Sequence, residues 1–207
     1  MPVRFQKKCP NGAHLLVWEV EENESTLISL LPSTILTDAE YEEIKIPHKK
    51  IELLASRVAI RHLAKSLNVV FEGIKKDENG KPYLVNSHWH MSVTHSRHFM
   101  AVVMHPEKAV GIDIERPQKK LQRILHRLFS AQEIEDMAGS LENMCIYWSA
   151  KEALYKLYGK RGTNFIDNLK VHKVAEGLLG EIIMPDHQET HQISIEKIDE
   201  YILVWAV

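Results

Sequence analysis

The stretch GIDIE at residues 111–115 alternates two acids with two isoleucines. This period of two predicts a β-strand on which Asp113 and Glu115 share one face and the isoleucines share the other. A second stretch, WSAKEALYK at residues 148–156, has the pattern of a helix on which Glu152 and Lys156 lie one turn apart. These two segments carry the most specific pattern in the chain, so the remaining sequence is interpreted around them.

Two carboxylates from a strand and a third from a helix suit a hard divalent cation. Mg²⁺ takes oxygen ligands, is held by a few carboxylates and keeps positions open for substrate phosphates. Asp113, Glu115 and Glu152 are therefore candidate metal ligands, and Mn²⁺ accepts the same oxygens. Lys156 would meet charge on a phosphate. The same residues also fit an ordinary surface, with an exposed acidic strand end and a Glu–Lys helix pair.

Length and composition describe an ordinary globular protein. A chain of 207 residues with 44% hydrophobic and 26% charged residues can bury a core as one large domain or two small ones. The formal net charge of −2 gives no signal for a nucleic acid or membrane partner. We see neither a secretory signal nor an apolar run approaching the ~18 residues of a membrane span. Cys9 and Cys145 are far apart, and we expect a reduced cytoplasmic protein.

The first half, residues 1–105, mixes strands with one long helix. Apolar positions at helical spacing predict a helix over residues 48–67, and Thr37 begins a capping-box pattern for a short helix that ends near Ile46. Residues 25–31 fit either a helix or a strand. The turn after His105 separates the halves. Strands are predicted at 14–20, 82–86, 89–94 and 99–104.

The second half, residues 106–207, follows a similar plan. After the strand at 111–115 we expect a helical segment at 121–127, a capping box that begins at Ser130, and a long helix near 142–159. Strands are predicted at 165–174, 178–184, 191–197 and 201–206. Each half is thus predicted to be an α+β unit of about a hundred residues.

The two opening segments resemble the paired signature of the Sfp-type 4′-phosphopantetheinyl transferases, G-I-D-[IV]-E and W-x-x-K-E-[AS]-x-x-K, in the same order and at comparable separation. The resemblance implies an α+β pseudo-dimer of two similar halves with the active site at their interface. It also implies the activity of a holo-acyl-carrier-protein synthase. Such enzymes transfer 4′-phosphopantetheine from coenzyme A to a serine of an apo acyl or peptidyl carrier protein and release 3′,5′-ADP.

Two further segments extend the resemblance to the coenzyme A site. HKKIELLASR at residues 48–57 is similar to the family's K-[RK]-x-x-E-x-L-A-[GS]-R, which implies that Lys50 and Arg57 bind the 3′-phosphate, with Lys49 as a neighbour. The G-K-P turn of the family, here Gly80, Lys81 and Pro82, lies against adenine and ribose. Without the resemblance, the first segment fits a solvated helix face and the second a generic turn.

SVTHS at residues 92–96 resembles the family's [NS]-[IV]-S-H-S, with threonine at the place of the usual middle serine. The resemblance assigns contact with the pyrophosphate to His95, with Ser96 beside it. A different interpretation of this region is a zinc site, because four histidines lie within eleven residues. They are His88, His90, His95 and His98.

The resemblance also distributes the catalytic roles. Mg²⁺ held by Asp113, Glu115 and Glu152 would offset charge on the pyrophosphate. Lys156 would stabilise or protonate the leaving phosphate, and His95 would add a hydrogen-bond donor. A carboxylate of the metal cluster, for which we select Glu152, would act as general base for the serine hydroxyl, directly or through water. Phosphoryl transfer of this kind depends on positioning and charge neutralisation.

The partner is predicted only in outline. A basic patch follows the acidic strand and is a candidate carrier-docking surface, although a solvated helix explains it equally well; its members are Lys119, Lys120, Arg123, His126 and Arg127. Fatty-acid, polyketide, peptide-synthetase and lysine-pathway carriers all remain open, and a monomer suffices for one site. Two other functions are a metal-dependent phosphohydrolase of a nucleotide diphosphate and a non-catalytic carrier-binding module.

Overall fold

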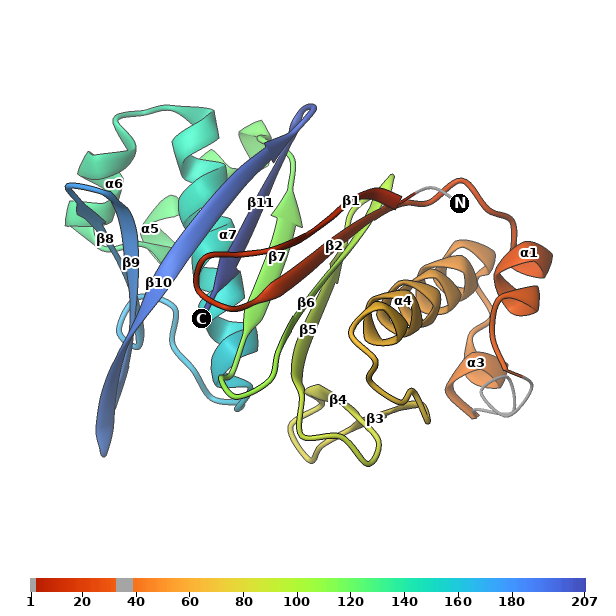
Figure 1. Cartoon of the computed structure of the whole chain (residues 1–207). Helices are drawn as coiled ribbons and strands as arrows, with labels where there is room; N and C mark the ends of the chain where they lie inside the picture. Colours follow the sequence, from red (N-terminus) through yellow and green to blue (C-terminus); the bar gives the residue numbers. More distant parts are fainter. Residues whose placement is uncertain (1–2, 33–38) are drawn as a thin grey trace. The chain divides into compact units, whose positions relative to one another are not determined.

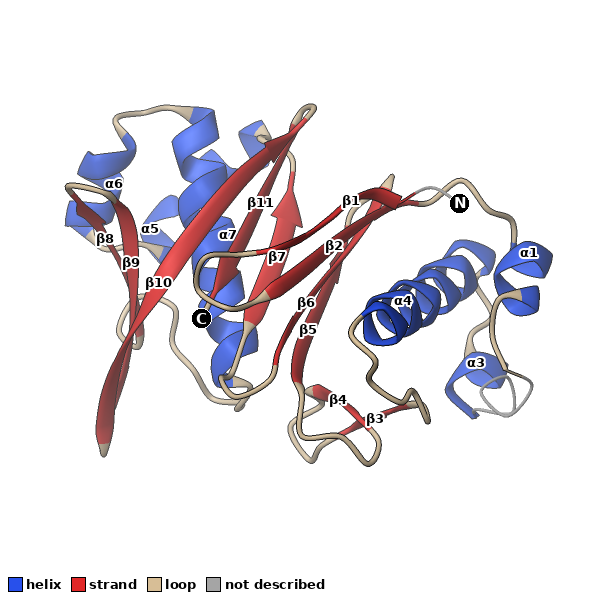
Figure 2. Cartoon of the chain, in the orientation of Figure 1, coloured by secondary structure: helices blue, strands red, loops and turns tan. Residues whose placement is uncertain are grey.

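The computed structural model describes residues 3–32 and 39–207, which form two compact units (Figure 1). The first unit holds the described residues up to Asp77 together with Pro82–Glu107. The second holds Glu78–Lys81 and Lys108–Val207. Each unit combines an antiparallel sheet with one long helix, so the predicted α+β class is confirmed (Figure 2). The pseudo-dimer with a shared site stays a prediction.

The sheet of the first unit has the strand order β1-β2-β6-β5 and is antiparallel throughout. The long helix α4 (Pro47–Ser66) packs against β6, β2 and β5 through a buried stripe that includes Leu54, Val58 and Leu63. Pro47 stands in the first turn of α4, where its missing N–H costs nothing. The strands are β1 (Val3–Lys8), β2 (His14–Glu19), β5 (His90–His95) and β6 (Phe99–His105).

Smaller elements complete the first unit. Helices α1 (Glu24–Ser29) and α3 (Ala39–Glu43) precede α4 (Pro47–Ser66). A short hairpin follows it, formed by β3 (Ile74–Lys76) and β4 (Pro82–Leu84). The ambiguous segment at 25–31 is thus mostly helical. Thr37 lies outside the described residues.

The sheet of the second unit has the strand order β7-β11-β10-β9-β8 and is also antiparallel. Helix α7 (Leu141–Tyr158) packs against β7, β11, β8 and β9, and Gly159 ends it in the left-handed conformation. The strands are β7 (Gly111–Glu115), β8 (Leu169–Val174), β9 (Gly177–Met184), β10 (His187–Ile198) and β11 (Tyr201–Ala206).

The predicted helix over 121–127 is wrong in one respect, because two short pieces replace it. A 3₁₀ turn, η1 (Lys119–Arg123), is followed by α5 (Leu125–Leu128), and Ile124 separates them. The capping box at Ser130 is confirmed at the start of α6 (Ala131–Met137), where Ser130 and Glu133 exchange hydrogen bonds. Strands β1 and β3 were not predicted. In the described part of the chain no helix is both long and apolar enough to cross a membrane.

Candidate functional site

The two acids of β7 face helix α7. β7 pairs with β11 so that Asp113 lies opposite Val204 and Glu115 lies opposite Ile202. Val204 and Ile202 belong to the apolar core that packs against α7, and residues opposite each other in antiparallel strands share a face. Asp113 is 6% exposed. The alternation predicted from GIDIE therefore directs both carboxylates towards the helix that carries Glu152 and Lys156.

Gly111 allows α7 to approach β7 this closely. A Cβ atom added at Gly111 would lie 1.8 Å from the carbonyl oxygen of Ala153 and 2.7 Å from the amide nitrogen of Leu157. Both are backbone atoms of α7, so a side-chain rotation cannot relieve the clash. The glycine of the GIDIE segment is thus explained by close packing of a strand against a helix, since any other residue would push the helix away.

Lys156 joins the helix to the acidic strand. Its Nζ donates hydrogen bonds to Oδ1 of Asp113 and to the carbonyl oxygen of Ile112, both at 2.9 Å. Asp113 is buried, whereas Lys156 is partly exposed, so this charge-assisted bond is shielded on one side from water. The lysine neutralises one of the acids of the cluster and holds its own ammonium group beside them.

The carboxyl group of Glu152 has an unusual affinity for its proton. Burial, together with the nearby negative charges of Asp113 and Glu115, raises the pKa of Glu152 from 4.5 to about 7, against the opposing effect of Lys156. The group is therefore only partly ionised near neutral pH. Mutual repulsion of this kind requires that the three carboxylates lie in one neighbourhood.

The acidic neighbourhood matches the predicted metal site in its chemistry but not in its side-chain arrangement. The three carboxylates are the oxygen donors that a hard divalent cation takes, and their crowding gives negative charge that a cation would offset. Within the described residues, however, no group of three or more acidic, histidine or cysteine side chains is arranged as a metal site. The ammonium of Lys156 binds Asp113 instead. The donor chemistry therefore fits Mg²⁺, while Lys156 neutralises part of the negative charge of the cluster.

Lys151, a residue of the same helix, was not singled out from the sequence. Its side chain is fully buried, and its Nζ donates to Oε2 of Glu133 at 2.9 Å and to the carbonyl oxygens of Leu128 and Phe165. Burial lowers the pKa of Lys151 to about 8, although Glu133 opposes the shift. Glu133 also accepts from the amide of Val171. Lys151 therefore fastens the surrounding loops to α7. The signal in the sequence that could have identified Lys151 was its position next to Glu152 in the segment at residues 148–156.

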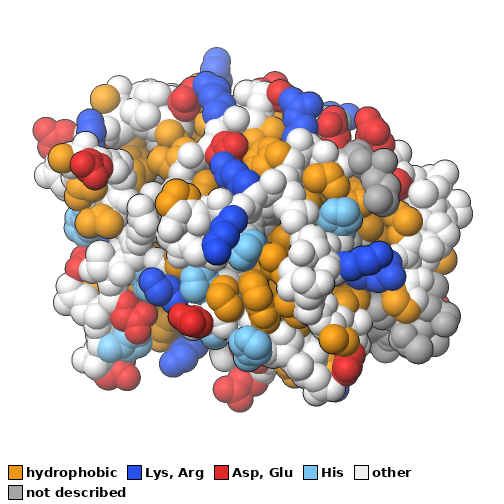
Figure 3. Space-filling view, viewed as in Figure 1, with side chains coloured by type: hydrophobic (Ala, Val, Ile, Leu, Met, Phe, Trp, Pro, Cys, Tyr) orange, Lys and Arg blue, Asp and Glu red, His pale blue; other side chains and the backbone are white. Residues whose placement is uncertain are grey.

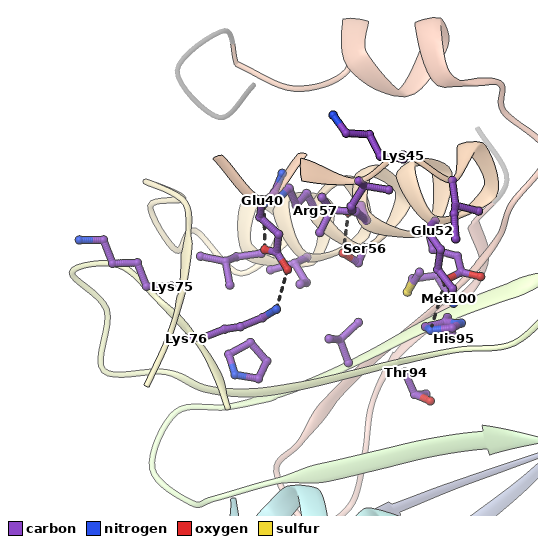
Figure 4. Close-up of a pocket in the computed structure, with 18 residues that line it drawn as sticks. Glu40, Lys45, Glu52, Ser56, Arg57, Lys75, Lys76, Thr94, His95 and Met100 are labelled. Carbon is purple, nitrogen blue, oxygen red and sulfur yellow. Dashed lines mark hydrogen bonds and ion pairs between the residues drawn. The ribbon is translucent and has the colours of Figure 1, made fainter. Parts of the chain in front are cut away.

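The first unit contains a cavity of about 1040 Å³, which is large enough for a sizeable small molecule (Figure 4). Apolar side chains of α4, β3 and β5 form much of its wall. Charged groups line it as well, with five cations against two carboxylates. The charged residues are Lys45, Lys49, Arg57, Lys75, Lys76, Glu40 and Glu52. A ligand that combines an apolar body with negative charge matches this lining.

Three of the predicted coenzyme A residues line this cavity, namely Arg57, Pro82 and His95. Arg57 is 4% exposed and its Nη2 lies 3.4 Å from Oε2 of Glu40. Nε2 of His95 lies 3.6 Å from Oε2 of Glu52, which also binds Lys49. The structure thus brings the helix motif and the β5 motif to one cavity.

The other predicted coenzyme A residues lie elsewhere. Lys50 does not line the cavity, and its Nζ lies 4.4 Å from the centre of the Tyr41 ring. Lys81 donates to the carbonyl oxygen of Leu157 at 2.6 Å near the end of α7. Gly80 has a φ of +91°, and Ser96 lies in the turn after β5, where its amide donates to Phe99. Gly80, Lys81 and Ser96 do not line the cavity.

The zinc interpretation finds no support among the described residues, which contain no metal-binding group of three histidines, cysteines or acids. His90 and His95 are the two ends of β5 and, five positions apart, point to opposite faces. His88 and His98 lie outside the strand. On the face in Figure 3, histidines are interspersed with acidic and basic side chains.

All members of the basic patch are exposed, and no ion pair holds any of them within the described residues. η1 contributes Lys119, Lys120 and Arg123, and α5 contributes His126 and Arg127. The patch begins four residues after Glu115, the last residue of β7. Its cations are therefore available to an acidic partner and close in sequence to the acidic cluster.

Together these features describe an α+β protein with an acidic cluster on one unit and a cation-lined cavity in the other. The model of the 4′-phosphopantetheinyl transferase superfamily matches residues 109–206. A 4′-phosphopantetheinyl transferase of Bacillus pumilus, psf-1, is 28% identical over 158 residues, which cover 70% of this chain and 66% of the relative. Over its second unit the chain is thus similar to the 4′-phosphopantetheinyl transferase superfamily, and the match spans just under two thirds of the relative's length.

Proposed function

We propose that the protein transfers the 4′-phosphopantetheine group from coenzyme A to a serine of an apo acyl or peptidyl carrier protein. The serine oxygen would bond to the β-phosphorus, the bond from that phosphorus to the bridging oxygen would break, and 3′,5′-ADP would leave. The observation that carries the proposal is the gathering of Asp113, Glu115, Glu152 and Lys156 between β7 and α7. The match to the superfamily model, the similarity to the relative from Bacillus pumilus and the cation-lined cavity support it.

Asp113, Glu115 and Glu152 would hold Mg²⁺, or Mn²⁺ in its place. The bound cation would supply charge neutralisation at the pyrophosphate. Lys156, already hydrogen-bonded beside this group, would donate to the leaving phosphate oxygen. Asp113 would bind the cation and Lys156 would bind the phosphate, so each would give up part of the hydrogen bond that now joins them.

Glu152 is suited to accept the proton of the serine hydroxyl. A general base works best when its pKa lies near the working pH, and burial raises the pKa of Glu152 to about 7. His95 would contribute a hydrogen bond to the pyrophosphate from the edge of the cavity, where it is 48% exposed. Arg57 would contact the 3′-phosphate deeper in the same cavity. In this assignment the first unit binds coenzyme A and the second performs the transfer.

Mass spectrometry of intact protein tests the proposal. An apo acyl carrier protein is incubated with this protein, coenzyme A and Mg²⁺, and the carrier should gain one phosphopantetheine group. The gain should disappear with EDTA and fall by about 100-fold in rate in the Lys156→Met variant, because one charged donor to the leaving group is lost. Release of 3′,5′-ADP without a gain on any carrier would instead identify a phosphohydrolase. Carrier binding without either reaction would identify a non-catalytic module.

The basic patch is proposed to dock the carrier, on the expectation that the carrier presents acidic side chains beside its serine. Reversing charge in Arg123→Glu and Arg127→Glu, singly and together, should raise the KM for the carrier by about tenfold and leave the Kd for coenzyme A unchanged. Lys173→Glu is the matched control, since Lys173 is an exposed cation on β8 of the same unit. An unchanged KM in the double variant would exclude the patch as the docking surface.

A further inference from the structure

Glu40 lies in the wall of the cavity between two cations, Lys76 and Arg57 (Figure 4). Its Oε1 accepts a hydrogen bond from Nζ of Lys76 at 2.6 Å, and its Oε2 lies 3.4 Å from Nη2 of Arg57. The three residues come from three separate elements, α3, β3 and α4. One carboxylate therefore bridges a lysine and an arginine that are distant in sequence.

The two cations differ in how freely they can move. The Arg57 side chain is buried on α4, so its guanidinium stays where the helix places it. Lys76 is 55% exposed on a short strand and can follow a ligand. Their nitrogens converge on Glu40, so a single anion suffices to satisfy both. A phosphate monoester, with three terminal oxygens and up to two negative charges, would satisfy them better than one carboxylate.

We infer that Glu40 acts as a built-in competitor for the phosphate-binding position of the cavity. In the absence of ligand its carboxylate neutralises Arg57 and Lys76, and a phosphate monoester must displace it before both cations can bind the phosphate. With the proposed function as the basis for naming the ligand, that phosphate is the 3′-phosphate of coenzyme A. Glu40 then sets the affinity of the enzyme for coenzyme A and limits its retention of the product 3′,5′-ADP.

The surroundings of Glu40 make displacement feasible. The side chain is 41% exposed, so the carboxylate can rotate into water at modest cost. Glu52, the second acid of the cavity, contacts Lys49 and His95 instead of these two cations. Competition at this anion position is therefore specific to Glu40. An alternative role for Glu40 is to orient Arg57 and Lys76 for the ligand, and this role predicts the opposite effect of its removal.

Calorimetric titration separates the two roles. Dissociation constants are measured for coenzyme A, adenosine 3′-monophosphate and dephospho-coenzyme A, with the wild type, Glu40→Gln and Glu43→Gln. The last variant is a matched control, because Glu43 is an exposed acid on the same helix that does not line the cavity. Glu40→Gln should bind both 3′-phosphate ligands about tenfold more tightly. Glu43→Gln should change them by less than about twofold. Dephospho-coenzyme A, which lacks the 3′-phosphate, should bind equally to all three proteins.

Each outcome decides the inference. Unchanged or weaker binding of the 3′-phosphate ligands by Glu40→Gln overturns it, as does equal tightening of dephospho-coenzyme A. Failure of both 3′-phosphate ligands to bind any of the three proteins overturns it too. The proposed function is tested separately: if adenosine 3′-monophosphate shows the Glu40 effect while coenzyme A does not bind, the competitor role holds and the coenzyme A assignment falls. Far-ultraviolet circular dichroism verifies that both variants are folded.

Discussion

The Gly111→Ala variant is expected to lose at least about 3 kcal/mol of unfolding free energy, the upper end of the range for an overpacked core. The added methyl would stand 1.8 Å from the carbonyl oxygen of Ala153, well inside van der Waals contact. Since β7 and α7 meet there through backbone atoms, the helix must move outward or the strand must leave the sheet. Either movement separates Glu152 and Lys156 from Asp113. We therefore expect transfer activity to be lost with stability, as measured by urea unfolding and the carrier assay.

Gly162→Ala is the control for this prediction. A Cβ at Gly162 would meet no atom within 4 Å, although its φ of +81° disfavours alanine. The Gly162→Ala variant should therefore lose about 1 kcal/mol of unfolding free energy, the penalty for alanine in a left-handed backbone conformation. A Gly111→Ala protein as stable as Gly162→Ala would show that α7 can move away from β7 at little cost. The steric account of the glycine would then be wrong.

The Glu152→Gln variant is expected to be more stable than the wild type above neutral pH and to have almost no transfer activity. In the metal-free wild type, the folded protein keeps the proton of Glu152 up to about pH 7, whereas the unfolded chain releases it near 4.5. The stability that Glu152 contributes is therefore complete below pH 4.5 and is lost as the pH rises through 7. Glutamine stays neutral, so the variant should gain on the order of 3 kcal/mol relative to the wild type between pH 4.5 and 8.

Urea unfolding in EDTA at pH 4.5 and pH 8 measures this difference. Added Mg²⁺ should stabilise the wild type at pH 8, because we propose that the ionised cluster binds it, and should stabilise Glu152→Gln much less. Glu142→Gln serves as control, since Glu142 is an exposed residue in the first turn of the same helix and pairs with Lys197 at the surface. Parallel pH profiles for wild type and Glu152→Gln would contradict the buried, charge-crowded environment assigned to this carboxyl group.

Local patterns in the sequence were sufficient for most of the elements. The long helices α4 and α7 show apolar positions at helical spacing, and the buried strands β2 and β6 are short apolar runs. β1 was missed because its residues alternate weakly and are largely exposed. The helix at 121–127 was predicted whole, but Ile124 interrupts it, which no periodicity indicates. The spacing of apolar residues predicts an element only where one of its faces is apolar, so a segment without an apolar face is missed.

The candidate site divides in a similar way. Alternation along β7 and the four-residue spacing on α7 were enough to predict that Asp113 and Glu115 share a face and that Glu152 and Lys156 are neighbours. The ion pair between Lys156 and Asp113 shows that the strand and the helix meet at these residues. Repeating spacings translate directly into direction because strand and helix geometry are regular. The resemblance to the superfamily was found from the same two segments, since they hold residues of defined type at defined separation.

The burial of charged side chains and their pairing across elements could be seen only in the tertiary structure. Lys50, Lys81, Lys151 and Lys156 have the same ammonium group, yet only Lys151 is fully buried, and Lys81 binds the end of a helix. The bridge from Glu40 to Arg57 and Lys76 joins residues of α3, α4 and β3. Local sequence patterns specified most of the elements, the directions of the side chains on β7 and α7, and the resemblance to the superfamily. Charge interactions at a distance in sequence depend on packing between elements, because the energy of a charge is set by its neighbours and its exposure to water.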